Sequence, residues 1–134
     1  MSSRRISVLV VEDDREIREL LVQVLREEGH EVSSSSDGST ALERLRAGFR
    51  PDVILLDLLM PPGICGSEFI AQLRRQEGYS AIPVIVTSAA SPKLVAYPRA
   101  EGYLEKPFHL DDLRRAVERV CAGRLEPAAA RDLR

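Results

Sequence analysis

The chain alternates between short runs of apolar residues and longer stretches in which apolar residues recur every three or four positions. Unbroken apolar runs are typical of strands buried on both faces, whereas the spaced pattern is typical of amphipathic helices. The runs, together with a shorter and more polar second segment, predict five strands at residues 6–11, 31–34, 53–57, 83–87 and 102–106.

Helices are predicted between these strands, each with an apolar stripe that faces the core. The stripes consist of Ile17, Leu20, Leu21, Val24 and Leu25 in the first helix, Ala41, Leu42 and Leu45 in the second, Phe69, Ile70 and Leu73 in the third, and Leu110, Leu113, Val117, Val120 and Cys121 in the last. Between the fourth and fifth strands, Ser91-Pro92 can begin a helix that Pro98 ends by Tyr97. That helix has fewer than two turns.

Strand–helix alternation implies parallel strands joined by right-handed crossovers. The fold class is therefore α/β: a doubly wound, five-stranded parallel sheet with helices on both faces and a shortened fourth helix. The 134 residues suffice for one domain. Residues 1–122 are predicted to form it, and residues 123–134 a tail or the start of a linker.

Composition narrows the class of partner and the compartment. The formal net charge of −2 argues against direct nucleic-acid binding, which requires a basic face. The two cysteines, Cys65 and Cys121, are distant in sequence and indicate reduced thiols in a cytoplasmic protein. No apolar run approaches the length of a membrane span, so membrane insertion is not expected.

Polar residues end four of the five predicted strands. Glu12 and Asp13 follow the first strand, Asp57 ends the third, Ser88 follows the fourth and Lys106 ends the fifth. Because the carboxyl ends of parallel strands lie at one edge of the sheet, these residues are predicted to converge there. Lys106 is also one of only two lysines among 19 basic residues, which sets it apart.

Each residue has an ordinary explanation when taken alone. Asp13 or Asp14 can cap the following helix, Ser88 can be a turn residue and Lys106 can be a solvated charge. Asp57 is harder to explain in this way because it follows four apolar residues. The joint occurrence of these residues at one edge favours a functional site.

The chemistry expected of such a site is phosphoryl transfer. Clustered carboxylates repel one another, and a hard cation such as Mg²⁺ relieves that repulsion through oxygen ligands. Asp57 is a candidate nucleophile, because carboxylates can form aspartyl phosphates. Lys106 would supply positive charge to the phosphoryl group, and Ser88 a hydrogen bond.

The chain resembles the receiver domains of two-component response regulators over residues 6–122. The resemblance is carried by VVEDD, ILLDLLMP, IPVIVTSA and GYLEKPF. It implies strand order 2-1-3-4-5, as in chemotaxis receivers, and Mg²⁺-dependent transfer of a phosphoryl group to Asp57. The donor would be a histidine kinase or a histidine phosphotransfer protein, and a downstream protein target would respond. The chain would be a phosphoacceptor with at most self-phosphorylation and self-dephosphorylation activity, not an enzyme.

The resemblance also assigns residue roles. Asp13 and Asp57 would bind the metal directly, Glu12 through water and Leu59 through its backbone carbonyl. Aligning Pro83 with the family's proline makes Ser88, not Thr87, the switch hydroxyl. Tyr103 would be the aromatic residue whose rotamer follows the switch, and Lys106 would contact the phosphoryl group.

Two departures from the family carry expectations. Only 17 residues separate Ser88 from Lys106, which is shorter than the family norm by roughly one helical turn of 3.6 residues. A homodimer, if one forms, would therefore not use the usual face around the fourth helix. The apolar Leu59, two residues after Asp57, predicts slow self-dephosphorylation.

Three other functions are weighed. A receiver fold that acts as an unphosphorylated protein-interaction module is favoured by the shortened helix and disfavoured by the intact polar residues. A flavodoxin-like or nucleotide-binding protein is excluded because the first strand–helix turn is acidic and lacks glycine. A haloacid-dehalogenase-type phosphatase would require an acid at the position of Leu59.

Overall fold

The computed structural model describes residues 5–57, 66–76, 78–89 and 100–122. The strands in this part of the chain are β1 (Ser7–Val11), β2 (Glu31–Ser35), β3 (Val53–Asp57), β4 (Val84–Ser88) and β5 (Gly102–Glu105). The helices are α1 (Arg15–Glu27), α2 (Gly38–Arg46), α3 (Gly66–Arg74) and α4 (Leu110–Ala122). Each predicted strand is present, with ends that differ by one residue at most.

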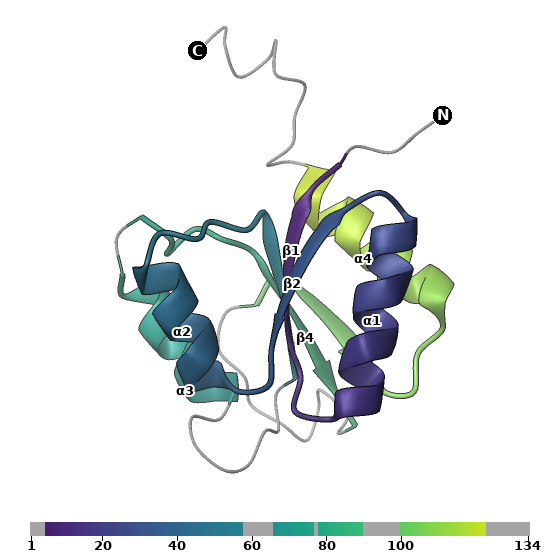
Figure 1. Ribbon diagram of the computed structural model, residues 1–134, viewed down its shortest axis with the longest axis horizontal. Coiled ribbons are helices and arrows are strands. Elements are labelled where there is room, and N and C mark those ends of the chain that lie inside the picture. The colour runs from purple at the N-terminus through teal and green to yellow at the C-terminus, as the bar shows by residue number, and fades with distance from the viewer. Residues whose placement is uncertain (1–4, 58–65, 77, 90–99, 123–134) are drawn as a thin grey trace, which may run out of the picture.

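The strands form one sheet in the order β2-β1-β3-β4-β5, and every neighbouring pair is parallel. Figure 1 shows three layers, with α1 and α4 on one face of the sheet and α2 and α3 on the other. The predicted α/β class, strand order and placement of helices are confirmed. The predicted short helix at residues 91–97 lies outside the described residues, as does the tail from residue 123.

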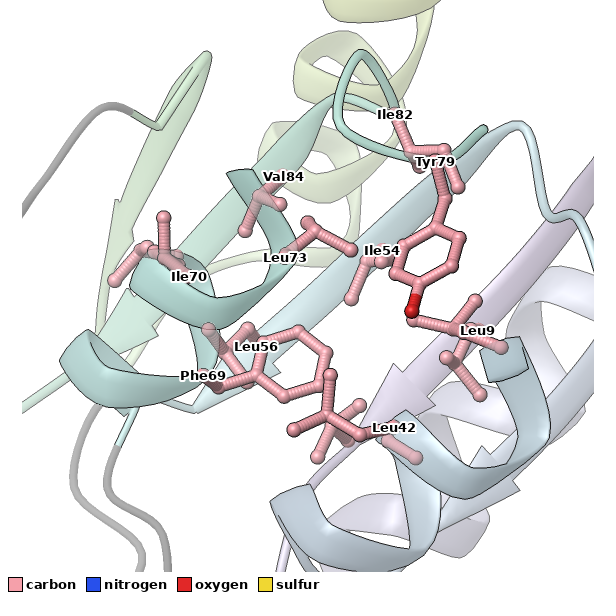
Figure 2. Close-up of a cluster of buried hydrophobic side chains, with 14 residues drawn as sticks. Leu9, Leu42, Ile54, Leu56, Phe69, Ile70, Leu73, Tyr79, Ile82 and Val84 are labelled. Carbon is pink, nitrogen blue, oxygen red and sulfur yellow. The ribbon is translucent and has the colours of Figure 1, made fainter. Parts of the chain in front are cut away.

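Two apolar clusters hold the layers together, because alternate side chains of the central strands point to opposite faces. Leu9, Ile54 and Leu56 pack towards α2 and α3 in one cluster with Leu42, Phe69 and Tyr79, which Figure 2 shows. Val8, Val10, Val53 and Leu55 pack towards α1 and α4, where Cys121 is buried as predicted. Central strands buried on both faces explain why their sequences show no polar alternation.

The first two helices begin at aspartate caps. The Asp14 carboxylate accepts from Ile17 N at 3.1 Å, and the Asp37 carboxylate accepts from Thr40 N at 2.7 Å. The hydrogen bond from Thr40 N is the main reason that the pKa of Asp37 is lowered. Both helices are followed by a glycine at positive φ, Gly29 at 98° and Gly48 at 114°, which ends the helix without steric cost.

Two predicted core positions are wrong. Leu20 is 50% exposed and Leu110 is 43% exposed. The buried face of α1 is centred on Leu21 and Leu25, so Val22 packs against the core and Leu20 lies at the edge of the stripe. Leu110 is the first residue of α4, and the buried residues of this helix begin one turn later, at Leu113. Among the described helices, none has the length and apolar character needed to cross a membrane.

His30 lies where the chain enters β2, and it makes stability depend on pH. Its Nδ1 accepts from Ile6 N at 3.3 Å, so this nitrogen carries no proton in the folded protein. Burial lowers the pKa of His30 below its usual 6.5, although the charges of Glu28 and Glu118 act in the opposite direction. Below pH 6.5 the His30 imidazole therefore binds a proton more readily in the unfolded chain than in the folded protein.

We therefore expect His30 to reduce the free energy of unfolding as the pH falls below 6.5. His30→Asn keeps an acceptor for Ile6 N but does not titrate. The free energy of unfolding of each protein is measured with urea. From pH 7 to pH 5, we expect the variant to become increasingly more stable than wild type. His109→Asn, at an exposed position before α4, is the control. A stability difference between wild type and His30→Asn that is constant with pH would contradict the prediction.

Candidate functional site

The sheet register brings the polar strand ends together at one edge. Leu56 is the Cα partner of Val11, Asp57 the partner of Thr87, and Ser88 the partner of Glu105. The residues that follow β1 and β5 are therefore beside the ends of β3 and β4. The predicted convergence of four strand ends is present, and it places acids and one lysine around a single point.

Three carboxylates gather at this edge. One oxygen each from Glu12, Asp13 and Asp57 can be chosen so that all three lie within 4.8 Å of one another. Glu12 is 1% exposed and Asp57 is 6% exposed, whereas Asp13 is open to solvent. The site thus combines two buried acids with one exposed acid.

Lys106 is the cation that faces the two buried acids. Its Nζ donates to Glu12 Oε1 at 3.1 Å and to Asp57 Oδ2 at 3.3 Å. The backbone of Lys106 is fixed by its own hydrogen bond, because Lys106 N donates to Ser88 O at 2.7 Å. The lysine side chain is only 21% exposed, so water screens these ion pairs weakly.

Burial and the neighbouring charges both shift the pKa values of Glu12 and Lys106. Burial raises the pKa of Glu12 to about 7, assisted by a hydrogen bond and charge repulsion from Asp57 and opposed by Lys106. Burial lowers the pKa of Lys106, but its hydrogen bond to Glu12 and the charges of both acids outweigh this and raise it. A cation beside Glu12, Asp13 and Asp57 would offset the repulsion between their ionised carboxylates.

The residues present fit Mg²⁺. Hard oxygen ligands, few protein groups and access to water are the features that this ion prefers. Glu12, Asp13 and Asp57 supply the oxygens, and Asp13 is exposed enough to allow bound water. The predicted carbonyl ligand, Leu59, lies outside the described residues.

Ser88 and Tyr103 are positioned by the alternation of the last two strands. Tyr103 is the partner of Val86, and Ser88 is the partner of Glu105. Ser88 and Tyr103 therefore point to the same face of the sheet, that of α2 and α3, whereas Thr87 points to the opposite face. Ser88 is fully buried and Tyr103 is partly buried against the core. The register thus places Ser88, and not Thr87, on the face of the sheet that carries Tyr103.

One contributor at this edge was not predicted. Arg18, from the first turn of α1, turns back to the β1–α1 connection and donates to the Glu12 carbonyl at 2.8 Å. The sequence contains only a weak signal for this contact. Arg18 lies on the helix that follows the acids, on its partly buried side. Its target is a backbone atom, so no partner could be identified from residue types.

Comparison with known proteins gives a consistent result. Residues 8–118 match the family profile described as "Response regulator receiver domain". The chain is 37% identical over 110 residues to the transcriptional regulatory protein TcrA of Mycobacterium tuberculosis, covering 81% of this chain and 43% of TcrA. It is 35% identical over 133 residues to the DNA-binding response regulator MtrA of Mycolicibacterium smegmatis, covering 96% of this chain and 56% of MtrA. The chain thus spans about half the length of these relatives.

Solved structures match the fold as well. The chemotaxis response regulator CheY4 of Vibrio cholerae aligns with a TM-score of 0.76 and 33% sequence identity. The alignment covers 87% of this chain and 99% of that one. The shared part therefore corresponds to the whole of that structure.

Proposed function

Since this chain belongs to the response regulator receiver domain family, we propose that it accepts a phosphoryl group on Asp57. The donor is the phosphohistidine of a histidine kinase or of a histidine phosphotransfer protein, and the reaction depends on Mg²⁺. The observation that carries the proposal is the placement of the buried Asp57 carboxylate 3.3 Å from Lys106 Nζ, beside two further acids.

The transfer is a displacement at phosphorus. A carboxylate oxygen of Asp57 forms the new O–P bond while the P–N bond of the phosphohistidine breaks, and the imidazole retains the electron pair and is protonated. Mg²⁺, held by Asp13 and Asp57 and by Glu12 through water, would neutralise phosphoryl oxygens. Asp57 reacts through a carboxylate oxygen, and Lys106 Nζ lies 3.3 Å from Asp57 Oδ2.

Lys106 and Ser88 would then hold the product. The Nζ atom already lies between Glu12 and Asp57, so it needs little movement to donate to a phosphoryl oxygen. Ser88 is the residue after Thr87, which is the register partner of Asp57. Its hydroxyl would donate to another phosphoryl oxygen. Movement of Ser88 towards the phosphoryl group would free space on the face that it shares with Tyr103, and this change would alter contacts with a downstream protein.

The chain would act as a phosphoacceptor with at most self-phosphorylation and self-dephosphorylation activity. An interaction module that is never phosphorylated is less well supported, because it would have no use for two buried acids and their lysine. The cysteine content, two residues distant in sequence, still predicts that the reaction takes place in the cytoplasm. The slow self-dephosphorylation expected from Leu59 also stays a prediction.

The test is incubation of the protein with Mg²⁺ and acetyl phosphate, followed by intact mass measurement. We expect a mass increase equal to one phosphoryl group, which disappears when EDTA is present during the incubation. Treatment with hydroxylamine should remove the adduct, because it cleaves acyl phosphates but not phosphoserine. A wild-type protein without an adduct would favour the interaction-module alternative.

A further inference from the structure

The turn between β1 and α1 carries the acidic pair, and a side chain from α1 fixes its backbone. Arg18 Nη1 donates to Glu12 O at 2.8 Å and lies 3.4 Å from Asp13 O. We propose that Arg18 is a positioning residue for the metal site, which orients the Asp13 carboxylate without touching the ion. This inference rests on the proposed function, because it assigns a role within the same site.

Asp13 depends on its backbone more than the other two acids do. Glu12 and Asp57 are each held by Lys106. In the described part of the chain, the exposed Asp13 side chain has neither a hydrogen bond nor an ion pair with another residue. Its direction is therefore determined by the backbone conformation at Asp13.

Arg18 acts on the two peptide groups that flank the Asp13 Cα. The Glu12 carbonyl belongs to the preceding peptide group and the Asp13 carbonyl to the following one. Holding both carbonyls with one guanidinium restricts φ and ψ of Asp13, and thereby restricts where its Cβ points. Through Arg18, α1 thus helps to hold Asp13 in the precise orientation that a metal site requires.

The turn has other contacts besides those of Arg18. Asp14 N donates to Glu12 Oε2 at 3.2 Å, and Glu12 N donates to Ser35 O at 3.1 Å. The Asp14 carboxylate caps α1 through Ile17 N. The bond from Asp14 N restrains the same peptide group whose carbonyl Arg18 approaches, the one that follows Asp13. Among these contacts, Arg18 is the one whose donor reaches the carbonyls on both sides of Asp13.

The test compares Mg²⁺ affinities of the unphosphorylated protein by isothermal titration calorimetry. Arg18→Met keeps the apolar stem and removes the donors, and we expect its affinity to fall about tenfold. The matched control is Arg15→Met on the same helix, where the exposed arginine pairs only with Glu19 among the described residues. Both variants lose one positive charge, so the control removes any general effect of charge.

A second measurement needs no metal. Amide hydrogen exchange at Asp13 and Asp14 should be faster in Arg18→Met than in Arg15→Met, whereas exchange in the strands should be unchanged. Arg18→Lys restores charge with a single ammonium in place of the planar guanidinium, and we expect an intermediate Mg²⁺ affinity.

The outcomes separate this inference from the function on which it rests. Wild-type protein that fails to bind Mg²⁺ would overturn the proposed function. The role of Arg18 would be overturned if wild type and Arg18→Met bound Mg²⁺ with the same affinity. It would also be overturned if Arg18→Met and Arg15→Met lost Mg²⁺ affinity equally. Should Arg18→Met fail to fold, Arg18→Lys decides, and wild-type affinity in that variant would overturn the proposal.

Discussion

Asp57→Asn is expected to lose all phosphoryl incorporation and, without metal, to unfold at a higher urea concentration than wild type. The first effect follows because the amide of asparagine is a poor nucleophile and carries no charge. Intact mass after incubation with Mg²⁺ and acetyl phosphate measures it. Residual labelling of the variant would show that another residue accepts the phosphoryl group.

Asp52→Asn is the matched control, at the residue directly before the other end of β3. The Asp52 carboxylate accepts from Ser7 N at 2.8 Å, and an asparagine oxygen can accept the same hydrogen bond. We expect this variant to be phosphorylated like wild type. A loss of labelling there would mean that any change in β3 disrupts the site, and that Asp57→Asn is not informative.

The gain in stability follows from the arrangement of the two buried acids. Asp57 raises the pKa of Glu12 through a hydrogen bond and through charge repulsion. The variant removes the repulsion and leaves Lys106 paired with Glu12, so we expect a gain on the order of 1 kcal/mol, which corresponds to about one pKa unit. A less stable variant at pH 8 would show that the attraction between Lys106 and Asp57 is the larger effect.

The architecture was predictable because buried parallel strands have a distinctive sequence pattern. Val53 to Leu56 is apolar without interruption, since both faces of β3 are covered. The strand order itself came from family resemblance, because hydrophobic patterning does not specify which strands are neighbours. Leu20 was misassigned because the stripe fixes the direction of the buried face but not its width.

The site was predictable to the extent that it depends on strand ends. Asp57 and Lys106 follow directly from where β3 and β5 stop, and their 3.3 Å contact confirms the convergence. Contacts to backbone atoms were not predictable. Arg18 binds a carbonyl, and Arg74, which is largely buried at the end of α3, donates to the carbonyls of Ser80 and Ile82 and to Glu101. Such partners depend on the path of the chain, which residue types do not encode.

The second large effect concerns Glu12 and the pH dependence of the metal-free protein. The pKa of Glu12 is raised from 4.5 to about 7, so between these values the folded protein holds a proton that the unfolded chain releases. The free energy of unfolding therefore falls as the pH rises from 4.5 to 7, and this stabilisation is absent at higher pH. The pKa difference corresponds to on the order of 3 kcal/mol.

Glu12→Gln should flatten this dependence, because glutamine keeps the shape of the side chain but does not titrate. The measurement is the urea midpoint of wild type and variant at intervals from pH 5 to pH 8, with EDTA present. His30 acts in the opposite direction over part of this range, and the difference between the two proteins removes its contribution. Curves that run parallel would contradict the raised pKa.

Mg²⁺ should act on the same protein with the opposite pH dependence. The ion binds ionised carboxylates, so it competes with the proton on Glu12 and stabilises the folded protein more at pH 8 than at pH 5. We expect the wild-type midpoint to rise with added Mg²⁺ at pH 8 and to change little at pH 5. Because the ion would reach Glu12 only through water, Glu12→Gln should keep part of its response at pH 8. An equal response of wild type at both pH values would show that the ion binds away from Glu12.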